Sequence, residues 1–164
     1  MPNFRLPRGR NLMAPPDFAF DRMFAGQGQV TGGGNFPVVG LYNSSTVNEV
    51  AVVYGWSMRV TADTEVYFSY VRNPPRTSYT SADPLNPARA ASAVAVYNSV
   101  VSTPATPTAG SWQATLGSHY WPYPWPCAVV PPGWGWQATA PTGAITLYLT
   151  IFWMITSLAG HTSG

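Results

Sequence analysis

The stretch from Val129 to Trp153 constrains the possible folds more than any other part of the chain. A Val-Val-Pro-Pro-Gly break at Val129 to Gly133 precedes two apolar segments, Trp134 to Ala140 and Ile145 to Trp153, which flank a Pro-Thr-Gly turn. In the second segment every other residue is Ile, Leu or Trp, which is the period of two that a pleated strand imposes. We therefore expect these segments to form the closing hairpin of a β-sandwich.

Similar alternation recurs upstream. From Glu49 to Val60 the even positions are all large and apolar, while the odd positions are mostly small or polar, so this segment predicts a half-buried antiparallel strand. Thr64 to Arg72 alternates in the same way after a short connection, which suggests a second hairpin. Further strands are predicted at Phe36 to Tyr42, Val94 to Ser102 and Ser111 to Ser118. With turn signals between them and no convincing long helix, they predict an all-β fold, an antiparallel β-sandwich of the jelly-roll kind.

The first 35 residues differ from the rest, with scattered Pro and Arg followed by a glycine-rich run from Gly26 to Gly34. They predict an extended N-terminal arm and hinge at residues 1–35, a sandwich domain at 36–158 and a short flexible tail at 159–164. Pro16 to Phe24 has apolar residues at helical spacing, but so short a helix needs a docking surface. The arm either folds back on its own domain or reaches a neighbouring molecule.

Charge is scarce: only 9% of the residues are charged, against roughly 25% in typical soluble domains. Interface cores are depleted in charge and enriched in aromatic residues and Arg, and all the basic residues here are Arg. This favours a surface covered by neighbouring subunits, although Ser, Thr, Asn and Gln can also keep an uncharged surface solvated. The missing Lys is equally consistent with genomic base composition. A net charge of +2 is too small to indicate nucleic-acid binding.

Residues that carry out chemistry are few. The two histidines, His119 and His161, are far apart in the sequence, and Cys127 is the only cysteine. Asp63 and Glu65 would share one face of a strand, but they read more simply as a solvated strand start. We therefore expect no catalytic residues, no metal site and no cofactor, and hence a protein that is not an enzyme.

Membrane insertion and secretion are also disfavoured by the sequence. Ala144 to Ala159 is the most apolar stretch, but it is shorter than the roughly 20 residues of a membrane helix and contains Thr and Ser. The residues after Met1 lack the continuous apolar core of a signal peptide. We expect no membrane partner and no export by the usual route.

Aromatic residues make up 14% of the chain and cluster between Trp112 and Trp136. One interpretation is a carbohydrate-binding surface, because flat rings stack on sugars. The favoured interpretation is packing, in which the same rings fill the sandwich core or a subunit interface.

Four segments taken together carry a resemblance: Phe36 to Asn43, Val50 to Val60, Val130 to Trp136 and Leu147 to Trp153. Their arrangement resembles small jelly-roll structural proteins of tailed-bacteriophage particles. The resemblance implies a non-enzymatic virion component, such as a capsid decoration or cement protein or a minor head or tail protein, assembled in the host cytoplasm. It also implies a homo-oligomer, with a trimer favoured, and the major capsid protein or another virion protein as partner.

The residues expected to contact such partners are the phenylalanines of the arm and the aromatic loop near position 120. They are Phe4, Phe18, Phe20, Phe24, Tyr120, Trp121, Tyr123 and Trp125. The alternative function is a receptor-binding or glycan-binding module of a head or tail fibre or spike, with Tyr120 to Trp125 as an exposed tip.

Overall fold

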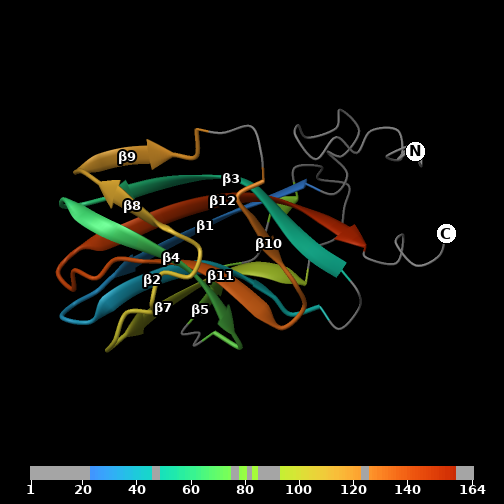
Figure 1. The fold of residues 1–164 in the computed structure, drawn as a ribbon, viewed down its shortest axis with the longest axis horizontal. Helices are drawn as coiled ribbons and strands as arrows, with labels where there is room; N and C mark the ends of the chain where they lie inside the picture. Colours follow the sequence, from blue (N-terminus) through green and yellow to red (C-terminus); the bar gives the residue numbers. More distant parts are fainter. Residues whose placement is uncertain are drawn as a thin grey trace, which may run out of the picture.

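The computed structural model describes residues 23–45, 49–74, 78–80, 83–84, 93–122 and 126–157, with the backbone alone at 78–80, 83–84 and 157. In these residues the regular secondary structure is all β-strand, arranged as two packed layers (Figure 1). The strands are β1 (Met23–Thr31), β2 (Phe36–Asn43), β3 (Glu49–Val60), β4 (Thr64–Arg72), β5 (Ser78–Thr80), β6 (Asp83–Pro84), β7 (Val94–Val101), β8 (Ser111–Ala114), β9 (Gly117–Tyr120), β10 (Ala128–Val130), β11 (Trp134–Thr139) and β12 (Thr146–Ser157). No described segment is a helix long and apolar enough to cross a membrane.

The strands form two six-stranded sheets. The first sheet has the order β10-β3-β12-β1-β6, with β9 also pairing with β3, and the second has the order β5-β7-β2-β11-β4-β8. All pairings between these strands are antiparallel. The predicted all-β antiparallel sandwich is confirmed.

The pairings are nested along the chain. β1 pairs with β12, β2 with β11, β3 with both β9 and β10, and β4 with β8. The chain thus runs as one long antiparallel ribbon that wraps around itself and places alternate members of the ribbon in opposite sheets. This is the jelly-roll arrangement. The segment between β4 and β8 adds three strands: β7 pairs with β2, β5 pairs with β7, and β6 pairs with β1.

Both predicted hairpins are wrong in their pairing. β11 and β12 lie in opposite sheets, and so do β3 and β4, so the short connections after Val60 and Thr139 cross from one sheet to the other. Packed sheets lie only about 10 Å apart, a distance that three or four residues can span. Alternation identifies the face that a strand buries but does not identify its partner.

The predicted glycine-rich hinge is also wrong, because Met23–Thr31 forms β1, which pairs along its length with β12. Gly26 and Gly28 face the second sheet, where it comes closest. A Cβ atom at Gly28 would lie 2.5 Å from Cγ1 of Val39, so the glycines allow this close approach. The sandwich therefore begins by Met23 rather than at residue 36. Residues 1–22 of the predicted arm and the tail at 159–164 lie outside the described residues.

Two further strand predictions need correction. Ser111 to Ser118 was expected as one strand, but β8 and β9 belong to different sheets. At the crossing, Oδ1 of Asp63 accepts a hydrogen bond from the Leu116 N–H at 2.7 Å. In addition, the sequence analysis did not predict β5, β6 or β10.

The core lies between the two sheets, and the predicted inward face of β12 is confirmed, because its odd positions from Leu147 to Trp153 are fully buried. In β3 the register shifts at the Phe152/Trp153 position of β12, where β3 contains one extra residue, Tyr54. This bulge moves the inward positions of β3 from even to odd. Ala51 and Val53 therefore join the core, whereas the predicted apolar face had run through the even positions.

Candidate interaction surfaces

Phe24, a predicted partner contact, belongs to the core. It is only 6% exposed, and its ring stacks on Trp153 with centroids 5.9 Å apart. The strand places it there because Phe24 pairs with Trp153 in the β1–β12 ladder. Three other predicted contacts, Phe4, Phe18 and Phe20, lie outside the described residues.

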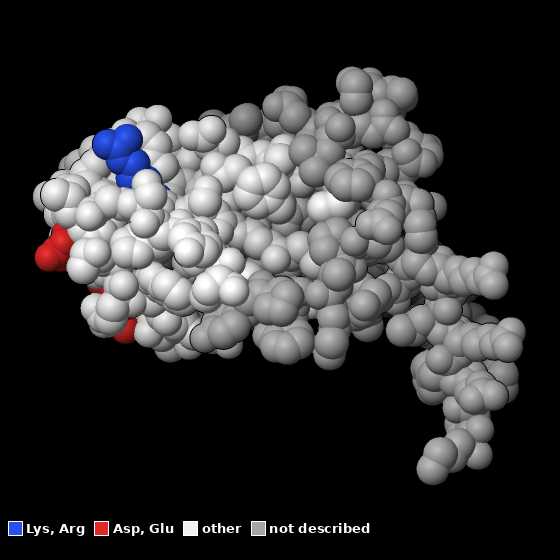
Figure 2. Space-filling view, turned by 90° about the horizontal axis from the view of Figure 1, so that it is seen from above, with Lys and Arg blue, Asp and Glu red and all other residues white. Residues whose placement is uncertain are grey.

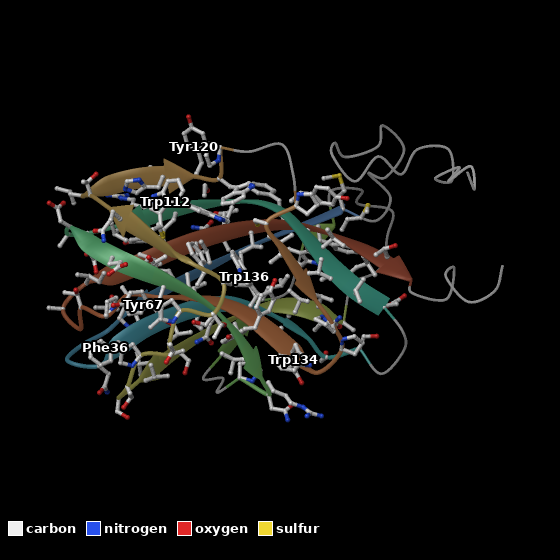
Figure 3. The ribbon with its side chains drawn as sticks, viewed as in Figure 1. Phe36, Tyr67, Trp112, Tyr120, Trp134 and Trp136 are labelled. Carbon is white, nitrogen blue, oxygen red and sulfur yellow. The ribbon has the colours of Figure 1, made fainter. Side chains whose placement is uncertain are left out.

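The described residues of the aromatic loop differ in their exposure to solvent. Tyr120 ends β9 with 70% of its surface exposed and points away from the sandwich (Figure 3). Trp121 is half-buried, and its ring lies 6.3 Å from that of Trp56. Tyr123 and Trp125 lie outside the described residues. Of the predicted loop contacts that are described, Tyr120 is the one fully available to a partner.

Of the clustered rings, Trp112, Trp121 and Trp136 pack between the sheets, at the edge where β8 faces β9 (Trp112 and Trp136 are labelled in Figure 3). Trp56 contacts Phe68 and Trp112 at centroid distances of 5.3 Å each, and Phe68 stacks on Trp136 at 5.1 Å. With Trp121 they line a hollow of about 250 Å³. Such pairs stabilise a core beyond the area they bury. For these residues the packing interpretation holds.

Cys127 lines the same hollow. Burial raises the pKa of its thiol from 9.0 to about 12, and the Sγ atom donates a hydrogen bond to the Val53 carbonyl at 3.4 Å. The group therefore remains a neutral thiol at physiological pH, whereas a reactive cysteine requires a thiolate.

His119 and Asp63, which were considered for chemistry, make hydrogen bonds to the backbone. Nε2 of His119 lies 2.8 Å from the Thr115 carbonyl, and Asp63 accepts from the Leu116 backbone. Within the described part of the chain, no three His, Cys, Asp or Glu side chains gather as metal ligands.

An accessible array of polar side chains lies on the outward side of the first sheet. Strand register aligns Gln27 with Thr150, Thr150 with Ser57, and Ser57 with Tyr120. These residues form a row across β1, β12, β3 and β9, all exposed except the half-buried Thr150. Neighbouring side chains in such a row stand about 5 Å apart.

A second row runs parallel to the first, two residues further along each strand. It contains Gln29, Tyr148, Arg59 and Ser118. The guanidinium of Arg59 lies over the Tyr148 ring, 5.5 Å from its centroid, a cation–π arrangement. The two rows are about 7 Å apart, so together they form a continuous polar grid.

On the other side of the first row stands Phe152, between Ala25 and Gly55. Its ring is 37% exposed, and a Cβ atom at Gly55 would meet nothing within 4 Å. On the Gly55 side there is therefore open space next to Phe152. We refer to the two polar rows and Phe152 together as the open face.

The open face contains a shallow hollow of about 270 Å³. It is lined by Gln27, Ser57, Met58, Arg59, Ser118, Tyr148 and Thr150. Arg59 is the one charged side chain among them. In Figure 2, which views the molecule from the side of β9 and β3, the charged side chains that are visible lie toward one end.

Sequence reasoning did not find this surface. Apart from Phe152, its members are polar, outward positions of four separate strands, and the paired residues Gln27 and Thr150 are over a hundred residues apart. The available signal was the run of polar residues Thr146, Tyr148 and Thr150, which alternates with the core positions of β12 and marks an outward face but not its neighbours.

Comparisons with known proteins add no relative: no family model, curated protein or solved structure matches this chain.

Proposed function

We propose that this protein is a non-enzymatic structural component of a virus particle, with a capsid decoration or cement role as its most specific form. The jelly roll supports the proposal in a general way, since viral capsid domains use it, but lectins use it too and fold alone does not assign function. The partner would be the major capsid protein or another virion protein, and the protein would act as a homo-oligomer, such as a trimer, located in the virion.

The observation that carries the proposal is the scarcity of charge on a folded, compact domain. Only 9% of the chain is charged. In the described part of the chain, the acidic and basic side chains are Glu49, Arg59, Asp63, Glu65 and Arg72. Surfaces of this composition are typical of proteins that spend their time in contact with neighbours.

Exposed apolar side chains supply contacts for such neighbours. They are spread over both sheets and the connections between them: Val100, Leu116, Tyr120, Val129, Trp134 and Phe152. Burial of several hundred Å² of apolar area contributes several kcal/mol, at about 25 cal/mol per Å², before ordering costs. Many copies on one particle, or several subunits in one oligomer, would multiply modest contacts through effective concentration.

Only some of the predicted partner contacts remain available to a partner. Phe24 and Trp121 contribute to packing within the domain, while Tyr120 remains available. The arm contacts Phe4, Phe18 and Phe20 remain a prediction. Glycan binding at the tip of the aromatic loop has less support, since Trp121 packs against Trp56.

The test is particle binding by the whole chain and by a chain that lacks residues 1–22. The deletion stops before Met23, because removal of β1 would destroy its ladder with β12. We expect the full chain to be a stoichiometric component of purified particles, and the shortened chain to stay folded by circular dichroism while its particle occupancy falls. Absence of the protein from particles would contradict the structural role, and full occupancy of the shortened chain would contradict the role of the arm.

A further inference from the structure

We infer that the open face binds a saccharide, with Phe152 as the stacking surface and Arg59 as the group that favours an acidic sugar. This inference goes beyond the structural role proposed above and does not depend on it. It also concerns the sheet, not the aromatic loop that the sequence suggested as a sugar-binding tip.

The polar groups of the face match the chemistry of a sugar. The hydroxyls of Ser57, Thr150, Ser118 and Tyr148 line the hollow together with the amide of Gln27. Each of these groups can both donate and accept hydrogen bonds, as every sugar hydroxyl does. Convergent polar groups of this kind fix the orientation of a small ligand.

Phe152 supplies the apolar half of the recognition. It follows Thr150 on the same side of β12, with Ala25 and Gly55 as its register partners, and the position of a Cβ atom at Gly55 is open space. An exposed aromatic ring offers a flat apolar surface that the C–H face of a sugar can cover. A larger side chain at position 55 would fill that space.

Arg59 adds a preference for negative charge. Its guanidinium presents donors and no acceptor, and its position over Tyr148 restricts its orientation. Among the described residues that line the hollow none is acidic, so none of them pairs with Arg59 in place of a ligand. A carboxylate can accept two parallel hydrogen bonds from Arg, and an acidic sugar carries one.

Other ligand classes fit less well. A nucleic acid requires several cations along its backbone, whereas the described part of this face has one, Arg59. An extended peptide adds to a sheet edge, but β3 and β12, which carry most of this face, are interior strands with partners on both sides. A sugar ring needs neither a charge array nor a free edge.

The test is a titration of the full chain, observed by backbone amide NMR, with the methyl glycosides of glucose, galactose and mannose and with the three matching uronic acids. We expect shifts at Ser57, Arg59, Thr150 and Phe152, and about tenfold tighter binding of the preferred uronate than of its neutral partner. Phe152→Ala should weaken binding about tenfold, whereas Val100→Ala, a similarly exposed apolar residue in the second sheet, should leave it unchanged.

Arg59→Gln should reduce the affinity for the uronate to that for the neutral sugar without abolishing binding. The amide spectra of the variants report whether each remains folded. The inference is overturned if none of the six sugars shifts the open face, if shifts occur only elsewhere, or if Phe152→Ala binds as the unmodified chain does. Particle occupancy is measured separately, so failure here leaves the structural proposal intact.

Discussion

Each outward face of the sandwich carries a row of residues aligned across four strands, but one row is buried and the other is exposed. On the second sheet, register aligns Ser69, Gln137, Gly40 and Tyr97 across β4, β11, β2 and β7. Tyr97 is 0% exposed and Gln137 3%, whereas Tyr120 in the corresponding row of the open face is 70% exposed. Polar composition alone therefore does not make a binding surface, because one row is closed over and the other is not.

The closed row is satisfied from within the chain. The Tyr97 hydroxyl reaches over Gly40 to donate a hydrogen bond to Oε1 of Gln137 at 2.5 Å. Ser69 donates to the Thr106 carbonyl at 2.8 Å, which holds part of the β7–β8 connection across this face. Buried polar groups need such partners, so the closed face is part of the folded core. The open face is left for ligands or neighbours.

Replacing one glycine in each face by alanine should give the largest difference between the two faces in the free energy of unfolding. A Cβ atom at Gly40 would lie 2.7 Å from the Trp136 carbonyl oxygen, while one at Gly55 would meet nothing within 4 Å. Gly40→Ala should lower the free energy of unfolding by about 3 kcal/mol. The matched Gly55→Ala should be neutral or stabilising by about 0.5 kcal/mol, since Gly weakens strands. Urea denaturation measures both, and equal effects would remove the contrast between the faces.

Removing one hydroxyl from each face is a milder comparison. Tyr97→Phe leaves the buried Gln137 without its donor and should cost about 2 kcal/mol. Tyr120→Phe changes an exposed group and should stay within about 0.5 kcal/mol of the unmodified chain. Thermal unfolding followed by circular dichroism gives both values. A neutral Tyr97→Phe variant would show that the closed row does not depend on this hydrogen bond.

The core between the two sheets contains the buried thiol of Cys127, which can be tested at alkaline pH. The pKa of Cys127 is raised from 9.0 to about 12 in the folded protein, so between these values the unfolded chain loses the thiol proton while the folded chain keeps it. Stability should therefore fall as pH rises above 9, by up to about 1.4 kcal/mol per pH unit. The relevant quantity is the difference from Cys127→Ala, measured by denaturation at several pH values, because this difference isolates the contribution of the thiol. Parallel curves for the two proteins would show that the thiol is not buried as described.

The smallest expected effect on stability is that of Arg59→Gln. The exposed cation–π contact with Tyr148 is worth about 0.5 kcal/mol, so the free energy of unfolding should hardly change. Chemical denaturation checks this value. A loss of several kcal/mol would mean that Arg59 supports the fold and is not free to recognise a ligand.

The strands with the strongest alternation could be predicted from the sequence. The bounds of β3 and β4 match the prediction because each has turn-forming residues at its ends and large apolar residues on one side. By contrast, β1 was missed since Gly26 and Gly28 occupy inward positions where an apolar side chain would have given the signal.

Strand partners and the open face could not be predicted in this way. A period of two does not show that Ile151 pairs with Trp56 in β3 rather than with a residue of β11. It also does not show that a bulge at Tyr54 exchanges the two sides of a strand. The open face depends on both, because Gln27, Thr150 and Ser57 meet only through the register of three separate strands.

Hydroxyl-radical footprinting of the free chain tests the contrast between the faces most directly, since it reports the solvent access of aromatic side chains in one experiment. The two faces provide matched probes: Tyr120 and Phe152 are 70% and 37% exposed, whereas Tyr42 and Tyr97 are 8% and 0% exposed. We predict rapid oxidation of Tyr120 and Phe152 and slow oxidation of Tyr42 and Tyr97. Protection of Phe152 to the level of Tyr97 would contradict the account, because the first sheet would then have no open face.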